Sequence, residues 1–153
     1  MKQIHAYLNF NGRCREAMSF YKDCLGGELI LQPIKGTPFE ARCPAGTEDH
    51  IMHSALKGEN FLIMASDMTP PEGIHSGNNF SLSLNCSSED ELRSSFDKLL
   101  EGGSVIEPIK VQFWGAVFGC LTDKFGIRWM FNYEISKPGQ TAGKTIEQQT
   151  QLN

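Results

Sequence analysis

The chain has 153 residues, of which 40% are hydrophobic and 21% are charged, and its formal net charge is −4. This composition is typical of a globular protein with its own core and excludes a disordered chain. The negative charge and the scattered Lys and Arg residues argue against nucleic-acid binding, and no apolar run is long enough to cross a bilayer. Because no apolar signal segment follows Met1, we expect a cytoplasmic protein with neither nucleic acid nor membrane as a partner.

The first strand and helix are predicted by a change in hydrophobic period. Apolar and polar residues alternate over 4–10, which indicates a strand with one apolar and one polar face. Asn11-Gly12 then interrupts the alternation. Over 13–25 the apolar residues recur three and four positions apart, as in an amphipathic helix, and Gly26-Gly27 supplies its stop.

The same succession recurs later in the chain. Residues 79–84 alternate again, Ser88 and Glu91 have the spacing of a capping box, and an apolar helical stripe follows as far as Leu100. Aligning the two copies sets His5 against Asn79 in the strands, and Tyr21 against Phe96 in the helices. These offsets differ by one residue, which indicates a duplication with a single insertion.

Three further strand-like runs follow each helix, and Gly or Pro positions separate them. They cover residues 28–34, 50–57 and 60–66 in the first copy, and 105–110, 116–122 and 127–133 in the second. The sequence therefore predicts an α+β fold made of two tandem βαβββ modules.

The module boundaries follow from composition. We expect one domain over 1–135, with the first module at 3–68 and the second at 78–134, joined by a Pro- and Gly-containing linker at 69–77. Residues 136–153 are rich in Gln, Thr and Lys and have almost nothing to bury, so they are expected to form a flexible tail.

The repeated strand–helix–three-strand pattern resembles the vicinal-oxygen-chelate superfamily of glyoxalases, bleomycin-resistance proteins and extradiol dioxygenases. Shorter motifs resemble its PhnB-like branch, which often carries the label 3-demethylubiquinone methyltransferase-like. They are Tyr7-Leu-x-Phe-Asn-Gly12, Ala17-Met-x-Phe-Tyr21, Leu25-Gly-Gly27, Met52-His53, Met64-Ala-Ser-Asp67, Phe113-Trp-Gly115 and Thr122-Asp-x-Phe-Gly126-x-x-Trp129. The resemblance covers about residues 3 to 134 and implies a cupped mixed sheet with helices outside, a small-molecule ligand and a homodimer.

Metal-using members of this superfamily place four ligands on the inner faces of the first and last strands of the two modules. The corresponding positions here are His5, Met64, Asn79 and Met130. Only His5 is a good donor for a divalent ion, because thioethers suit soft Cu(I) and a neutral amide binds weakly. We therefore expect no bound metal and no cofactor. The methyltransferase label has no support either, because both Gly-Gly pairs follow helices and neither opens one.

Eight residues are candidates for binding a ligand in the cup: His5, Tyr7, Met64, Asn79, Ser81, Trp114, Arg128 and Met130. His5 is also the candidate catalytic base, because imidazole titrates near neutral pH, although a polar strand residue that lines a cavity without chemistry is the simpler interpretation. Trp114 is suited either to stacking on a flat ligand or to packing beneath a turn. Arg128 is suited to an acidic ligand group or to a solvated rim position.

Other noticeable residues are assigned to the structure. His53 lies in an apolar strand and is interpreted as a satisfied structural histidine, Trp129 is assigned to the core, and Asp123 is expected to shape a turn. The five cysteines (Cys14, Cys24, Cys43, Cys86 and Cys120) form no C-x-x-C pair and are expected to be free thiols, mostly packed as small apolar residues.

Two functions stay open at this point. The first is a metal-independent protein that binds a small molecule. The second is a lyase or isomerase that uses His5 as general base, with or without a divalent metal.

Overall fold

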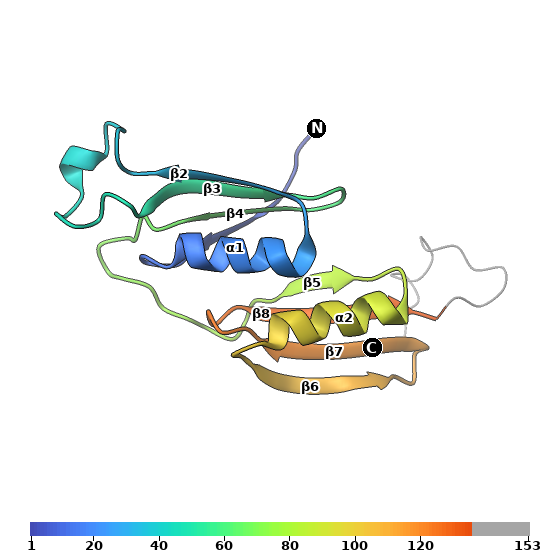
Figure 1. Cartoon of the computed structure of the whole chain (residues 1–153). Coiled ribbons are helices and arrows are strands. Elements are labelled where there is room, and N and C mark those ends of the chain that lie inside the picture. The colour runs from blue at the N-terminus through green and yellow to red at the C-terminus, as the bar shows by residue number, and fades with distance from the viewer. Residues whose placement is uncertain (136–153) are drawn as a thin grey trace. The chain divides into compact units, whose positions relative to one another are not determined.

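The computed structural model describes residues 1–135, so the predicted tail lies outside the described part of the chain. The chain divides into two compact units, the first ending at Gly77 and the second beginning at Asn78. Each unit contains one four-stranded mixed sheet and one α-helix (Figure 1). The prediction of an α+β fold with two βαβββ modules is confirmed.

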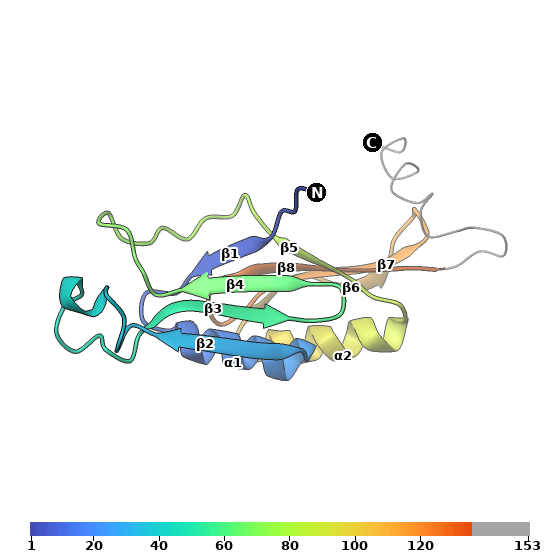
Figure 2. The ribbon, with the colours of Figure 1, turned by 90° about the horizontal axis from the view of Figure 1, so that it is seen from above.

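Unit 1 has its strands in the order β1-β4-β3-β2 (Figure 2). Strand β1 runs parallel to β4, and the other pairs are antiparallel. The elements are β1 (Ala6–Asn9), α1 (Cys14–Leu25), β2 (Glu28–Pro33), the short 3₁₀ helix η1 (Glu40–Arg42), β3 (Ile51–Lys57) and β4 (Leu62–Ser66).

Unit 2 repeats this topology with the order β5-β8-β7-β6, and β5 is parallel to β8. Its elements are β5 (Leu82–Asn85), α2 (Glu89–Leu100), β6 (Ser104–Val111), β7 (Ala116–Thr122) and β8 (Arg128–Glu134). In both units the strand before the helix and the last strand are therefore neighbours in the sheet.

Local chemistry sets the ends of the helices. Helix α1 ends at Gly26 and α2 is followed by Gly102, which have φ values of 77° and 74°, a region that glycine adopts without strain. At the start of α2 the Ser88 hydroxyl accepts a hydrogen bond from the Glu91 amide at 3.1 Å. The Glu91 carboxylate accepts from the amide of Ser87 at 2.8 Å, so the predicted capping box exists with its return bond shifted by one residue.

One face of each sheet is covered by its helix, and the core lies between them. Leu8, Ala65 and Leu56 face α1, whose Tyr21 is fully buried. In unit 2, Phe131 packs against Phe96 of α2 with ring centroids 5.2 Å apart. The opposite face of each sheet, which we call the helix-free face, carries the alternate residues of each strand.

Strand register shows how the two copies correspond. Tyr7 is opposite Met64 in unit 1, and Ser83 is opposite Met130 in unit 2. The hydrogen bonds beyond these pairs confirm the same register. The amide of Phe10 donates to the Ser66 oxygen in unit 1, and the amide of Cys86 donates to the Asn132 oxygen in unit 2.

The strand offset is therefore 76, and Ser81 corresponds to His5. The sequence alignment of His5 with Asn79 was wrong by two residues, because the alternation begins at Asn79 whereas strand pairing begins only at Leu82. The helix alignment of Tyr21 with Phe96 fits the observed helices, which begin 75 residues apart.

Candidate functional site

The helix-free face of unit 1 has a continuous apolar row across its four strands. Tyr7, Met64, Ala55 and Ile30 lie side by side on β1, β4, β3 and β2. Tyr7 is 53% exposed and Ile30 is 67% exposed. A row of this kind can contact the apolar part of a ligand, and Met64 adapts its shape to the contact.

The polar group on this face is formed by Tyr7 and His53. The Tyr7 hydroxyl and His53 Nδ1 lie 2.9 Å apart, and the two rings stack with centroids separated by 5.7 Å. His53 thus has a hydrogen-bond partner, as a structural histidine should, but the partner is an exposed residue on the helix-free face of the sheet. This pair joins residues 46 positions apart, so no local sequence pattern predicts it.

His5 lies just before β1 and is exposed. Its Nε2 is 3.1 Å from the Gln3 side-chain oxygen. The structure therefore does not bring His5 into the polar pair on the sheet, which His53 makes instead.

The corresponding row in unit 2 is more polar. Ser83, Met130, Cys120 and Glu107 lie side by side on β5, β8, β7 and β6. Burial raises the pKa of the Cys120 thiol, the negative charge of Glu107 raises it further, and Arg128 lowers it. A thiol with a raised pKa stays protonated at neutral pH, so Cys120 is a poor nucleophile there.

Trp114 lies in the turn between β6 and β7. Its ring meets Phe113 and Phe118 edge-on, with centroids 5.0 and 6.1 Å away. Phe118 belongs to the helix-free face, because it is opposite Asn132 and alternates with the helix-facing Gly119. The indole nitrogen of Trp114 is buried and has no hydrogen-bond partner among residues 1–135.

Arg128 begins β8, and its Nη1 donates to the backbone oxygen of Asn78 at 2.9 Å. Its Nε is buried and, within the described residues, has no partner. Asn79, the neighbour of that acceptor, is exposed and precedes β5, whereas Ser81 is half-buried beside the start of that strand. In unit 2 the structure thus places Arg128 and Met130 on one face of β8, with Ser81 just before β5 and Trp114 in the turn at the far end of the sheet.

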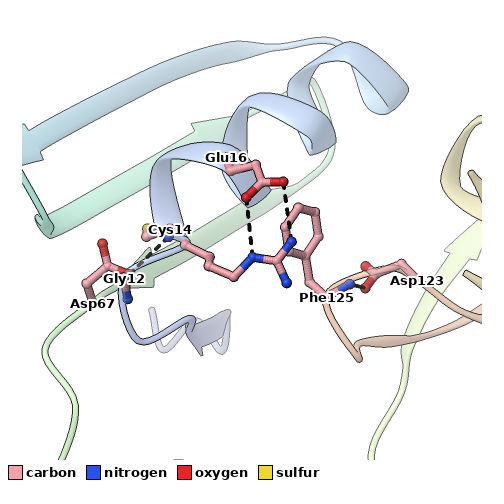
Figure 3. Close-up of polar contacts among 7 residues, drawn as sticks. Gly12, Cys14, Glu16, Asp67, Asp123 and Phe125 are labelled. Atoms are coloured by element: carbon pink, nitrogen blue, oxygen red, sulfur yellow. Dashed lines mark hydrogen bonds and ion pairs between the residues drawn. The ribbon is translucent and has the colours of Figure 1, made fainter. Parts of the chain in front are cut away.

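Two buried carboxylates organise the loops at the sheet ends (Figure 3). Asp67 accepts from the amides of Gly12, Cys14 and Ile51 at 2.7–2.9 Å, and so ties the start of α1 to the ends of β3 and β4. Asp123 accepts from the amides of Phe125 and Ile127 and from the Trp129 indole.

The expected turn at Asp123 and the core position of Trp129, which is 2% exposed, are confirmed. The role of Asp67 was missed, because a carboxylate at the end of a strand does not reveal amide partners that lie far away in sequence.

Residues 1–135 contain no group of three or more His, Cys, Asp or Glu side chains that could hold a metal ion. Within the same residues no helix is long and apolar enough to cross a membrane. Of the four positions that the resemblance assigns to metal ligands, His5 carries an imidazole, Met64 and Met130 are thioethers, and Ser81, which register sets in place of Asn79, is a hydroxyl. This donor set does not fit a divalent ion.

The fold and its duplicated modules define the class of protein. Residues 3–131 match the Glyoxalase/Bleomycin resistance protein/Dioxygenase superfamily, and the chain belongs to this superfamily. The expected resemblance is confirmed.

Individual proteins of the superfamily are similar to this chain over nearly its whole length. The chain is 32% identical to protein YjdN of Escherichia coli (strain K12) over 146 residues, which cover 90% of this chain and 99% of YjdN. The crystal structure of protein PA1353 from Pseudomonas aeruginosa has 44% identity and a TM-score of 0.78, covering 88% of this chain and 98% of PA1353. A PhnB protein from Bacillus cereus shares the fold, with 24% identity, a TM-score of 0.69, and coverage of 86% of this chain and 99% of that chain.

Proposed function

We propose that this protein binds a small molecule without a metal ion, and that the helix-free face of unit 2 contacts the ligand. The observation that carries the proposal is the Trp114 indole, whose buried N–H has no acceptor within residues 1–135 and lies beside the aromatic ring of Phe118. Buried polar groups in folded proteins are nearly always hydrogen-bonded, so this donor calls for an acceptor from outside residues 1–135. An aromatic ring with a free donor suits a flat ligand that carries an acceptor.

The superfamily name joins enzymes with resistance proteins, so membership alone does not choose between catalysis and binding. The side chains at the metal-ligand positions favour ligand binding over metal-dependent catalysis. Glyoxalase-type isomerisation and ring-opening dioxygenation need a metal ion as Lewis acid, and Met64 and Met130 are unsuited to hold one.

Thermal unfolding in the presence of a chelator tests the proposal. We expect at least one compound from a set of aromatic and antibiotic-like molecules to raise the melting temperature, and Trp114→Phe to reduce the affinity several-fold while keeping a ring. Each variant is compared with its own ligand-free melting curve. If no compound stabilises the wild type, the binding proposal is wrong.

One observation favours a second candidate, an enzyme of the lyase or isomerase type. The Tyr7 hydroxyl touches His53 Nδ1 on an exposed face, an arrangement in which imidazole can take up and return a proton. This moves the base from His5, the residue that the sequence indicated, to His53.

Two measurements separate the candidates. Elemental analysis of protein purified without a His-tag should find no stoichiometric Ni, Zn or Fe; a metal that is lost in His5→Ala would restore the metal-dependent alternative. For an acid–base enzyme, turnover of a stabilising compound should fall in His53→Gln and persist in His5→Ala. The homodimer and the cytoplasmic location also remain proposals, to be checked by sedimentation and by cell fractionation.

A further inference from the structure

The guanidinium of Arg128 makes a hydrogen bond through Nη1, whereas its Nε has no partner among the described residues. Its Nη1 donates to the Asn78 backbone oxygen at 2.9 Å, which orients the side chain toward the segment that leads into β5. Its Nε is buried and has no hydrogen-bond partner in the described part of the chain. The contact with Asn78 therefore explains the direction of the side chain but not why its Nε is buried.

The geometry of the arginine side chain shows which of its hydrogen-bond donors have no protein acceptor. A guanidinium presents its donors in a planar fork, and Nε–H and Nη2 lie along one edge of it, pointing in the same direction. Because Nη1 is the nitrogen bound to Asn78, the Nε–Nη2 edge is the one without a protein acceptor among residues 1–135. Two parallel N–H donors match the two oxygens of a carboxylate or the oxygens of a phosphate-like group.

Residues with hydroxyl groups flank Arg128 in the sequence of strands. Ser81 directly precedes β5, one residue before the pairing of Leu82 with Trp129, and Ser83 is opposite Met130 on the helix-free face. Thr122 is opposite Arg128 on the other side. Hydroxyl groups donate hydrogen bonds to an anion without adding charge of their own.

Two acidic residues share this face: Glu134 at the far end of β8, and Glu107 on the edge strand β6. Strands β8 and β6 are separated by β7, so their backbones are roughly 10 Å apart. An anion at Arg128 is therefore favoured on the β5 side and disfavoured toward β6.

We propose that the Nε–Nη2 edge of Arg128 binds an oxyanion group of the ligand, and that Ser81 and Ser83, at and before the start of β5, supply further hydrogen bonds. This inference rests on the proposed small-molecule-binding function and assigns the ligand a chemical class, an organic acid. Unit 1 has no counterpart, because register places Leu62 at the position of Arg128. The acid group is thus bound by unit 2 alone.

The aromatic side chains lie further along the same face. Phe118 is opposite Asn132, four residues from Arg128, which corresponds to about 13 Å of extended strand. A single ligand reaches both places only if it is elongated, so a small acid probes the Arg128 position separately from Trp114.

The full-length protein, labelled with ¹⁵N, allows a direct test by NMR. The Arg128 Nε–H resonance is identified by its absence in Arg128→Lys, and it is followed during titration with benzoate, phenylphosphonate or neutral benzamide at constant ionic strength. We expect a saturable shift with at least one of the two anions and none with benzamide. Benzoate alone would identify a carboxylate site, and phenylphosphonate alone a phosphate-type site.

Variants complete the test. Arg128→Lys keeps the charge but loses the fork, so it should weaken binding of the effective anion by about tenfold. Arg93→Lys, at an exposed residue on α2 that pairs with Glu89, is the matched control and should leave the affinity unchanged. The inference is wrong if neither anion moves the resonance up to its solubility limit, or if benzamide moves it equally.

The two proposals fail in different ways. If neutral compounds raise the melting temperature while neither anion shifts the Nε–H resonance, the small-molecule-binding proposal is supported and the oxyanion site at Arg128 is wrong. If no compound of any charge stabilises the protein and no resonance moves, both are wrong.

Discussion

Tyr7 and His53 make a hydrogen-bonded, stacked pair across β4, with 2.9 Å between the hydroxyl and Nδ1. The strand between them contributes Met64, which is opposite Tyr7. The pair therefore joins the first and third strands of unit 1 through side chains on the face that no helix covers.

Removing the hydroxyl should change the histidine rather than the fold. A neutral phenol donates readily, so His53 Nδ1 is expected to accept and to carry its own proton on Nε2. In Tyr7→Phe the ¹⁵N shifts of the His53 ring should move toward a mixture of tautomers, while the stability falls by less than about 1 kcal/mol because the hydroxyl is exposed. Unchanged ring shifts would show that the contact is absent in solution.

Asp67 is expected to be among the most sensitive residues of unit 1. It is 7% exposed and accepts three backbone amides, so Asp67→Ala leaves buried donors unpaired. The expected loss is about 3 kcal/mol or more, measured by urea unfolding. Asp97→Ala, at an exposed position of α2, serves as control and should lie within about 0.5 kcal/mol of the wild type.

In unit 2 the bond between Asp123 and Trp129 should show energetic coupling. The indole donates to the buried carboxylate at 2.9 Å. A double-mutant cycle with Asp123→Ala and Trp129→Phe is expected to give a coupling energy of about 1.5–3 kcal/mol, as for hydrogen bonds to charged groups. Additive effects of the two substitutions would contradict this assignment.

Helix α2 should contribute a measurable acid sensitivity. Hydrogen bonds from the Ser87 hydroxyl and amide hold the pKa of Glu91 below its ordinary value of 4.5. A lowered pKa in the folded state adds stability that is complete above the ordinary value and is lost as the pH falls through the folded value. Glu91→Gln should therefore have a shallower loss of stability on acidification than the wild type.

The size of this effect is limited because Glu91 is exposed, so solvent screens its charge. The comparison variant is Ser88→Ala, which removes the other half of the cap. It should cost about 1 kcal/mol at all pH values and leave the acid slope unchanged. An equal slope in wild type and Glu91→Gln would show that the Ser87 contacts do not persist in solution.

Much of the backbone was predictable because it depends on local patterns. The helices at 13–25 and 88–100 were marked by apolar spacing, glycine stops and the Ser88 cap, and all of these are observed. The error at β5 has a physical cause: alternation continues through Asn79 and Ser81, whereas hydrogen bonding to β8 starts at Leu82. Sequence pattern reports side-chain alternation, and only pairing defines the strand.

The candidate site was predictable as a set of faces but not as a set of contacts. Alternation places Tyr7 on the polar face of its strand, and the resemblance to the superfamily places Met64 and Met130 on inner faces; all three lie on the helix-free sides. Alternation offered no means of finding the partner of Tyr7 on β3 or the three amides around Asp67, because both depend on the way distant segments meet. His5 is favoured by its chemistry, by its place on the polar face of the first strand and by the superfamily's first ligand position, whereas its hydrogen-bond neighbour in the structure is Gln3.

The matching positions of Met64 and Met130 have a wider consequence. Around these two methionines the modules share a backbone but not a chemistry: Tyr7, Ala55 and Ile30 surround one, and Ser83, Cys120 and Glu107 surround the other. Duplication thus produced two surfaces that natural selection could alter separately. A chain rebuilt from two copies of the first module would keep the fold and lose every polar donor that distinguishes the second.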